Sequence, residues 1–254
     1  MSSSANPDSR AAVKRPFATL LATLGGNVFL VLGSALFGSL AILGSWLPPQ
    51  GNWVFLMARW WSRGLLACSG VGLVVQQDGE VEPDRCHIFM PNHQSLYDIP
   101  ALIASLPGQG RFFAKRSLFQ IPIFGWALKA GGFIAIDRQD RSRARESFAA
   151  AAKRLEEGVS TVIFPEGTRS LDGEMLPFER GGFLLALKSG RPIVPVGIRG
   201  SLGIRKRGDW KVTPGTITLT YGRPIEVADF TVRSREELAD KVHRQIAALA
   251  GLQP

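Results

Sequence analysis

The chain has 254 residues, of which 45% are hydrophobic, enough for one sizeable α/β domain with an additional segment. Its 30 Lys and Arg against 21 Asp and Glu give a formal charge of +9, which favours an anionic partner such as nucleic acid, an anionic membrane surface or a phosphorylated substrate. Its two cysteines are too few for a disulfide scaffold and its three histidines lack ligand spacing, so we expect a reducing compartment and no metal.

The N-terminal part of the chain predicts a membrane anchor. Residues 1–15 are small, polar and basic, which is typical of a disordered arm. Residues 16–58 contain no Asp, Glu, Lys, Arg or His. Because about 20 apolar residues span a bilayer and a signal peptide has an apolar region of only about 7 to 15, we predict a membrane-anchoring helical segment over residues 16–69.

Basic residues on both sides of the uncharged run at residues 16–58 favour a helical hairpin that dips into one leaflet and turns near residues 48–51. The second arm, residues 53–61, contains three tryptophans, a composition typical of the membrane interface. The alternatives are a deeply buried core helix for the first arm and an amphipathic helix packed on the main domain for the second.

Residues 70–254 alternate short apolar runs with helical patterns, which predicts an α/β domain with a mainly parallel sheet flanked by helices. The expected strands are residues 71–75, 86–90, 111–114, 133–136, 160–164, 193–198 and 216–221. The expected helices are residues 99–105, 118–129, 142–157, 182–188 and 234–250.

A histidine and an aspartate, His93 and Asp98, follow the second expected strand. On a helix this spacing leaves the side chains about 140° apart, and on a strand they face opposite sides, so they can meet only across a turn. Pro100 suits a first helical turn, which places the pair in a strand-to-helix loop, where ligands of α/β sheets bind. A neutral imidazole held by a carboxylate is a general base, although one such pair is also common by chance.

Polar and basic residues follow three further strands. The loop at residues 164–170 carries a carboxylate, a glycine, a hydroxyl and a guanidinium at Glu166, Gly167, Thr168 and Arg169. This combination suits an anionic cluster of oxygens, and an ordinary polar turn is the alternative. Lys115 and Arg138 each follow another strand, where a solvated surface charge is the alternative.

Together these segments resemble four motif blocks of the glycerolipid acyltransferases, and most closely those of the 1-acyl-glycerol-3-phosphate acyltransferases. The blocks are His93 to Asp98 and residues 132–138, 164–170 and 193–198, in the family's order. The resemblance implies transfer of a fatty acyl group from acyl-CoA or acyl carrier protein to the sn-2 hydroxyl of lysophosphatidic acid, giving phosphatidic acid in phospholipid biosynthesis.

The resemblance also implies the roles of single residues. His93 matches the general base and Asp98 the residue that orients it. Residues 166–169 match the block for acceptor binding, and Lys115 and Arg138 resemble residues that meet its phosphate. The acyl thioester is a co-substrate, so no cofactor is expected. The expected partners are a lipid acceptor, the donor and the bilayer, without nucleic acid. We expect the catalytic domain on the cytoplasmic face of a membrane, the inner membrane in a bacterium.

Three alternatives remain open. A hydrolase would use Ser95 as its nucleophile, but the chain has no Gly-x-Ser-x-Gly elbow. An acyltransferase could act on another lyso-lipid, such as lyso-ornithine lipid. A non-enzymatic membrane-anchored protein that binds lipid or nucleic acid would explain the charge but not the four blocks.

Overall fold

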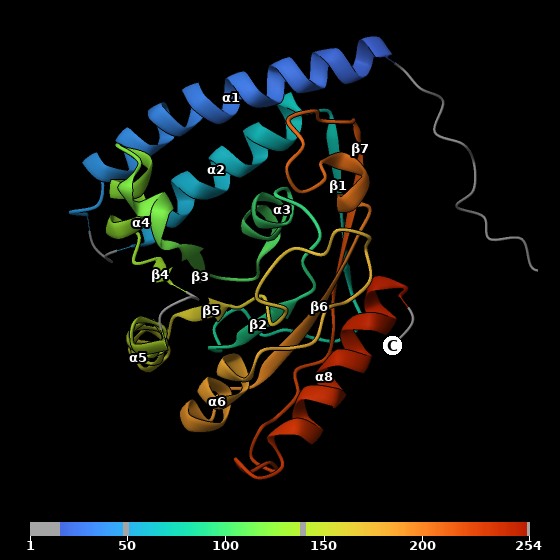
Figure 1. Ribbon diagram of the computed structural model, residues 1–254. Coiled ribbons are helices and arrows are strands. Elements are labelled where there is room, and N and C mark those ends of the chain that lie inside the picture. Colours follow the sequence, from blue (N-terminus) through green and yellow to red (C-terminus); the bar gives the residue numbers. More distant parts are fainter. Residues whose placement is uncertain (1–15, 48–50, 138–140, 253–254) are drawn as a thin grey trace, which may run out of the picture.

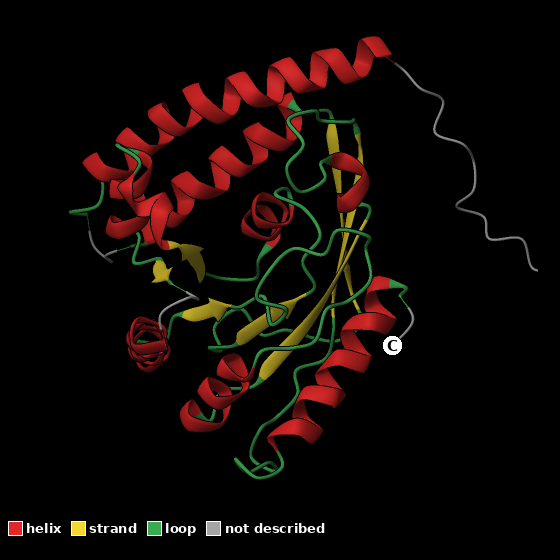
Figure 2. Ribbon diagram, in the orientation of Figure 1, coloured by secondary structure: helices red, strands yellow, loops and turns green. Residues whose placement is uncertain are grey.

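A seven-stranded sheet with helices on both faces forms the body of the molecule, as Figures 1 and 2 show. The computed structural model describes residues 16–47, 51–137 and 141–252. The strands are β1 (Val71–Gln77), β2 (Ile88–Pro91), β3 (Gly110–Lys115), β4 (Ile134–Ile136), β5 (Ser160–Val162), β6 (Ile193–Arg199) and β7 (Gly215–Tyr221). The helices are α1 (Pro16–Leu43), α2 (Asn52–Cys68), α3 (Asp98–Ser105), the 3-10 helix η2 (Arg116–Gln120), α4 (Phe124–Ala130), α5 (Arg141–Glu156), α6 (Arg180–Ser189), α7 (Ser201–Ile204) and α8 (Arg235–Ala250).

The strand order is β1-β7-β6-β2-β5-β3-β4. The five strands from β6 to β4 are parallel, whereas β7 runs antiparallel to β6 and β1 is parallel to β7. The predicted fold class, an α/β fold with a mainly parallel sheet, is therefore confirmed. Because the five strands point the same way, their carboxyl ends share one edge of the sheet, where α/β proteins bind ligands.

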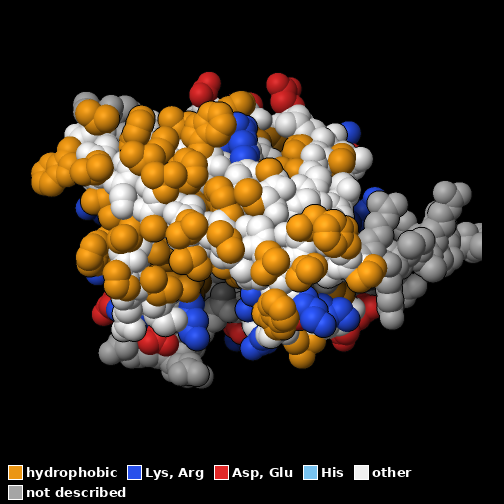
Figure 3. Space-filling model, turned by 90° about the horizontal axis from the view of Figure 1, so that it is seen from above, with side chains coloured by type: hydrophobic (Ala, Val, Ile, Leu, Met, Phe, Trp, Pro, Cys, Tyr) orange, Lys and Arg blue, Asp and Glu red, His pale blue; other side chains and the backbone are white. Residues whose placement is uncertain are grey.

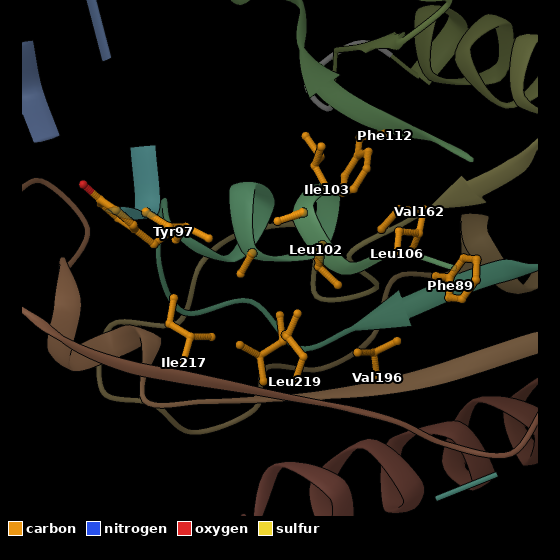
Figure 4. Close-up of a cluster of buried hydrophobic side chains, with 14 of the residues drawn as sticks. Phe89, Tyr97, Leu102, Ile103, Leu106, Phe112, Val162, Val196, Ile217 and Leu219 are labelled. Carbon is orange, nitrogen blue, oxygen red and sulfur yellow. The ribbon is translucent and has the colours of Figure 1, made fainter. Parts of the chain in front are cut away.

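Strand β2 runs through the middle of two hydrophobic cores. Ile88, Phe89 and Met90 are each fully buried, and successive strand residues point to opposite faces. Phe89 therefore packs under α3, in the cluster that Figure 4 shows with Leu102 and Leu219, while Ile88 and Met90 pack toward α5, α6 and α8. Burial on both faces explains why this strand is a continuous apolar run in the sequence.

The predicted helix over residues 118–129 is wrong. The chain instead forms η2, then a turn, and then α4. Pro122 lies in that turn and lacks a backbone N–H, and Ile123 has a φ of 63°, so a helix cannot continue through these two residues.

Helices α1 and α2 lie side by side over the top of the domain (Figure 1), and α2 in turn packs on α3. A Cβ atom on Gly26 of α1 would lie 2.5 Å from Ser69 Oγ and 3.0 Å from Tyr97 Oη. Only glycine therefore allows α1 to approach the loop between β2 and α3 this closely. The predicted turn of the hairpin lies partly outside the described residues.

The outer face of α1 is exposed, which excludes a deeply buried core helix. Its exposed large side chains are Phe17, Leu20, Leu21, Leu24, Val28, Val31, Leu32, Leu36, Leu40 and Leu43. By length and composition α1 is the one helix in the described part of the chain that could cross a membrane.

Candidate active site

The loop between β2 and α3 closes around one carboxylate oxygen. His93 Nδ1 lies 2.8 Å from Asp98 Oδ2, and the same oxygen accepts the backbone N–H groups of Gln94 and Ser95, each at 2.8 Å. Asp98 is completely buried at the first turn of α3, where a negative charge is favourable. These bonds form the turn that the spacing of the two residues requires.

The hydrogen bond to Asp98 fixes the proton of a neutral His93 on Nδ1, since a carboxylate can only accept. Nε2 is then the basic nitrogen, and no group in the described part of the chain forms a hydrogen bond with it. The imidazole stacks on the Phe164 ring, with centroids 3.8 Å apart, and 11% of its side chain is exposed. A fixed, partly exposed imidazole of this kind can remove a proton from a bound hydroxyl.

Glu166 supports the backbone on both sides of the site. Its Oε1 accepts the His93 N–H at 2.7 Å and its Oε2 accepts the Leu176 N–H at 3.0 Å. Burial raises the pKa of Glu166 to about 7, despite these two hydrogen bonds, and the nearby charge of Asp98 adds to the rise. The resemblance associates this residue with the acceptor, whereas both of its oxygens here bond to backbone.

The loop at residues 164–170 and the loop between β2 and α3 meet a second time beside His93, whose carbonyl accepts the Ser170 N–H at 2.8 Å. Between these contacts lies Gly167, with a φ of 70° that favours glycine. Arg169 is half-buried, and burial together with Arg207 lowers its pKa. The loop therefore holds a guanidinium close to the His93 loop.

Lys115 ends β3 at the same edge of the sheet as His93, and its side chain is exposed. Within the described residues its ammonium group forms no hydrogen bond and no ion pair. Arg138, which the resemblance also implies for the acceptor's phosphate, lies outside the described residues. The structure thus brings His93, Asp98 and Glu166 into direct contact, with Lys115 placed further along the edge.

The comparison with known proteins agrees with this arrangement. Residues 73–199, half of the chain, match the acyltransferase family model. The chain belongs to the acyltransferase family. The family resemblance inferred from the four blocks is thereby confirmed.

This acyltransferase is similar to a 1-acyl-sn-glycerol-3-phosphate acyltransferase of Chlamydomonas reinhardtii, at 29% identity over 76% of this chain and 58% of that protein. It is 31% identical to the human 1-acyl-sn-glycerol-3-phosphate acyltransferase beta over 73% of this chain and 67% of that one. The chain thus spans less than two thirds of the Chlamydomonas protein. The crystal structure of the 1-acyl-sn-glycerophosphate acyltransferase PlsC from Thermotoga maritima matches with a TM-score of 0.81 and 28% identity, over 93% of this chain and 96% of that one.

The basic residues after α7 contact the loops of the candidate site of this acyltransferase, and sequence reasoning missed them. Arg207 Nη1 donates to Thr168 Oγ1 at 3.2 Å. The carbonyl of Arg205 accepts the Ser95 hydroxyl at 2.7 Å, and its guanidinium donates to Asn27 Oδ1 of α1 at 3.3 Å. The sequence signal that could have identified them is the run of three successive basic residues, 205–207, a few residues after β6.

Asn92, just before His93, is a second omission. Its side chain both donates to the Ile198 carbonyl at 3.0 Å and accepts the Ile198 N–H at 2.7 Å. The last residue of the fourth block therefore contacts the residue just before the first block. These two hydrogen bonds fix where the His93 loop leaves the sheet.

The acyltransferase should tolerate loss of the Ser95 hydroxyl. Ser95 is completely buried and donates to a backbone carbonyl, so its oxygen is not placed to attack a substrate. We expect Ser95→Ala to keep kcat within about tenfold of the wild type and to lower the free energy of unfolding by about 1 kcal/mol, the contribution of a typical hydrogen bond. Kinetics and thermal unfolding would measure the two effects. Complete loss of turnover in a folded variant would instead assign Ser95 as a nucleophile.

Proposed function

We propose that this acyltransferase moves a fatty acyl group from an acyl thioester to the sn-2 hydroxyl of lysophosphatidic acid, producing phosphatidic acid for phospholipid synthesis. The observation that carries the proposal is the fixed His93–Asp98 pair beside the basic side chains of Arg169 and Arg207. The His93–Asp98 pair provides a general base that can deprotonate a hydroxyl, and the guanidinium groups of Arg169 and Arg207 suit a phosphate. The substrates named for the similar proteins support the same reaction.

The geometry suits direct transfer. His93 Nε2 removes the proton of the acceptor hydroxyl, whose oxygen forms a bond to the thioester carbonyl carbon. The carbon–sulfur bond then breaks, and the imidazolium gives its proton to the departing thiolate, so that an ester and a free thiol leave. Asp98 keeps Nδ1 protonated and stabilises the imidazolium charge. General base catalysis of this kind typically contributes about 100- to 10,000-fold in rate.

Release of free thiol by the purified full chain in lipid vesicles tests this proposal. Lysophosphatidic acid, lyso-ornithine lipid and monoacylglycerol would each be offered with an acyl-CoA and with an acylated carrier protein. We expect turnover to be fastest with lysophosphatidic acid. Faster turnover with lyso-ornithine lipid would replace the proposed acceptor, and binding without thiol release would identify a lipid-binding protein.

The guanidinium of Arg169 should recognise the acceptor's phosphate. We expect Arg169→Gln to raise KM for lysophosphatidic acid by about 10- to 100-fold, because charged hydrogen bonds contribute about 1.5–3 kcal/mol. KM for monoacylglycerol, which has no phosphate, should change much less. Arg223→Gln is the matched control, since Arg223 is exposed and, among the described residues, donates only to the Asp78 carbonyl. An unchanged KM for lysophosphatidic acid would exclude this role.

We propose further that the protein lies in one leaflet of a membrane, with its catalytic domain on the cytoplasmic side where the thioester donors are found. Figure 3 shows apolar side chains gathered over the face formed by α1 and α2. Leu56 and Trp60 of α2 and Trp126 of α4 are exposed along with the outer face of α1. Because α1 packs lengthwise on α2, it suits a position along the membrane surface rather than across it.

A charge on this face should weaken membrane binding. We expect Val28→Asp to lower affinity for anionic vesicles by about tenfold or more, since burying a valine side chain is worth about 1.5–3 kcal/mol. Val232→Asp is a matched control, because both valines are 54% exposed and Val232 precedes α8. Vesicle sedimentation measures both. An equal loss of vesicle affinity in the two variants would contradict the proposed orientation.

A further inference from the structure

The segment between α7 and β7 carries a tryptophan and several cations on the surface of the molecule. Residues 205–211, which we call the tryptophan loop, contain four basic residues and Trp210, whose side chain is 61% exposed. The exposed basic residues of the loop are Lys206, Arg207 and Lys211. A large aromatic side chain left in water among cations is typical of segments that lie at the surface of a membrane.

Hydrogen bonds join this part of the chain to the N-terminal half of α1, which it reaches from below in Figure 1. Asn27 Nδ2 donates to the Trp210 carbonyl at 3.1 Å, and Asn27 Oδ1 accepts the Arg205 guanidinium at 3.3 Å. The Thr23 hydroxyl accepts the N–H of Val212, the residue after the loop, at 3.0 Å. These three bonds hold the tryptophan loop against the helix.

The tryptophan loop lies on the flank of α1, beside the helix's exposed apolar stripe. At about 100° per residue, the stripe of Leu21, Leu24 and Val28 lies about 110° round the helix from Thr23 and Asn27. Each of the three stripe residues is more than half exposed. When α1 lies along a membrane with this stripe in the acyl chains, its flank is at the depth of the lipid head groups. The cations of the loop then meet the lipid phosphates, and the Trp210 ring lies at the interface, where tryptophan is favourable.

The charge of the loop and its apolar neighbours together select the partner. Four basic residues and one acidic residue give the loop a net charge of +3, which favours an anionic surface. Figure 3 shows Lys and Arg side chains along one border of the apolar face of the molecule. A nucleic acid would meet the same cations, but it offers nothing to cover the leucines and valines beside them. A membrane with anionic phospholipids supplies both the phosphates and the acyl chains.

The tryptophan loop also contacts both loops of the candidate site. The Arg205 carbonyl accepts the Ser95 hydroxyl at 2.7 Å, and Arg207 donates to Thr168 Oγ1 at 3.2 Å. Head groups that bind the tryptophan loop would therefore hold these two loops at the membrane surface from which a lipid acceptor is taken.

We propose that the tryptophan loop binds the phosphate groups of anionic phospholipids in the membrane. Lys206 and Lys211 pair with lipid phosphates, and the Trp210 ring lies among the head groups. This inference rests on the proposed position of α1 along the membrane. It adds a lipid contact that is separate from the acceptor's site at Arg169 and that makes membrane affinity depend on anionic lipid.

Sedimentation of the full chain with vesicles, in the absence of any acyl donor, tests the proposal. The vesicles contain phosphatidylcholine alone or phosphatidylcholine with phosphatidylglycerol, which is anionic. We expect the double variant Lys206→Gln, Lys211→Gln to bind the anionic vesicles about 25-fold more weakly than the wild type, because each basic residue near such a surface contributes about fivefold. Its affinity for the neutral vesicles should not change. Both lysines are exposed, so the variant should fold, and its circular dichroism would verify this.

The double variant Lys153→Gln, Lys188→Gln is the matched control. It removes two exposed lysines, and so the same charge, from α5 and α6 on the other face of the sheet. We expect it to bind both kinds of vesicle like the wild type. An equal loss of anionic-vesicle affinity in the two double variants would assign the effect to net charge and overturn the proposal. Wild-type affinity of the Lys206→Gln, Lys211→Gln variant for anionic vesicles would also overturn it.

Replacing the tryptophan tests the position of its ring. We expect Trp210→Ala to lower affinity for both kinds of vesicle by about tenfold, because the ring loses apolar surface that the interface covers. Unchanged affinity for both would overturn the proposed depth of the loop.

Two further results separate this inference from the proposed function. A loss of vesicle affinity in Val28→Asp but not in the Lys206→Gln, Lys211→Gln variant would overturn the role of the loop and leave the proposed membrane face standing. Anionic-vesicle binding that the lysine variant weakens, in a protein that transfers no acyl group to any lyso-lipid, would support the role of the loop and contradict the proposed function.

Discussion

Replacing His93 by alanine is expected to lower kcat by about 100- to 10,000-fold, the range that general base catalysis contributes. The imidazole has one nitrogen fixed by Asp98 and the other without a partner in the described residues, so the variant loses the proposed general base. KM for the acceptor should change little, because the basic side chains that suit its phosphate belong to other loops. Thiol release at saturating lysophosphatidic acid measures the effect.

Two controls make this result specific to the base. His243→Ala removes another imidazole, which contacts Phe178 beside α8, and should leave kcat close to the wild type. Thermal unfolding of His93→Ala should remain cooperative, since its side chain lies outside the hydrophobic cores and its ring contact is with Phe164 at the edge of one of them. A folded His93→Ala enzyme with more than a tenth of the wild-type kcat would rule out His93 as the essential base.

The strands and the catalytic loop could be predicted because their causes are local. Strand β2 is a run of apolar residues because both faces are buried, and the turn between His93 and Asp98 follows from their spacing and from Pro100. The break between η2 and α4 was missed because its apolar pattern fits a helix. Only the fixed φ and missing N–H of Pro122, with the unusual φ of Ile123, interrupt it.

The contacts that complete the site join residues far apart in the sequence, and no local pattern predicts them. Glu166 accepts the N–H of a residue 73 positions away, and Arg207 donates to a hydroxyl 39 positions away. The basic run at residues 205–207 resembles an ordinary exposed loop until the fold places it against the loop of Thr168. A resemblance of motifs thus identifies candidate residues of the site, but not which of them contact backbone and which are free to face a ligand.

Helix α1 shares contacts with the catalytic loop, which relates the proposed membrane face to the chemistry. Asn27 accepts a hydrogen bond from the Arg205 side chain, and the carbonyl of Arg205 accepts the hydroxyl of Ser95. Gly26 lies beside Tyr97, in the same loop as His93. A lipid acceptor taken up beside α1 would therefore have a short path to the imidazole.

Replacing Glu166 by glutamine is expected to lower kcat by about 100-fold, although the side chain is not placed to touch the substrate. Each carboxylate oxygen accepts one backbone N–H, from His93 and from Leu176. Glutamine has one acceptor oxygen, so its NH2 group would face one of these N–H donors. The loop must then shift, and a displacement of about 1 Å in a reacting group can cost about 100-fold in rate.

The dependence of stability on pH tests this role separately from activity. Since burial raises the pKa of Glu166 from 4.5 to about 7, the folded protein holds an extra proton between these values. The wild type should therefore lose stability as pH rises from about 4.5 to 7, by about 1.4 kcal/mol for each unit of pKa shift, and should show no further change from this group above about 7. Glutamine does not titrate, so Glu166→Gln should lack this decline.

The free energies of unfolding of the two proteins, measured in denaturant between pH 5 and 8, should accordingly converge. At pH 5 the variant should be less stable by about 1–3 kcal/mol, the cost of an unsatisfied buried donor, and the difference should narrow toward pH 8. Glu174→Gln, a change to an exposed carboxylate in the same loop, should show neither the loss of kcat nor the convergence. A difference that widens with pH would mean that the folded protein favours the ionised carboxylate, contrary to the effect of its burial.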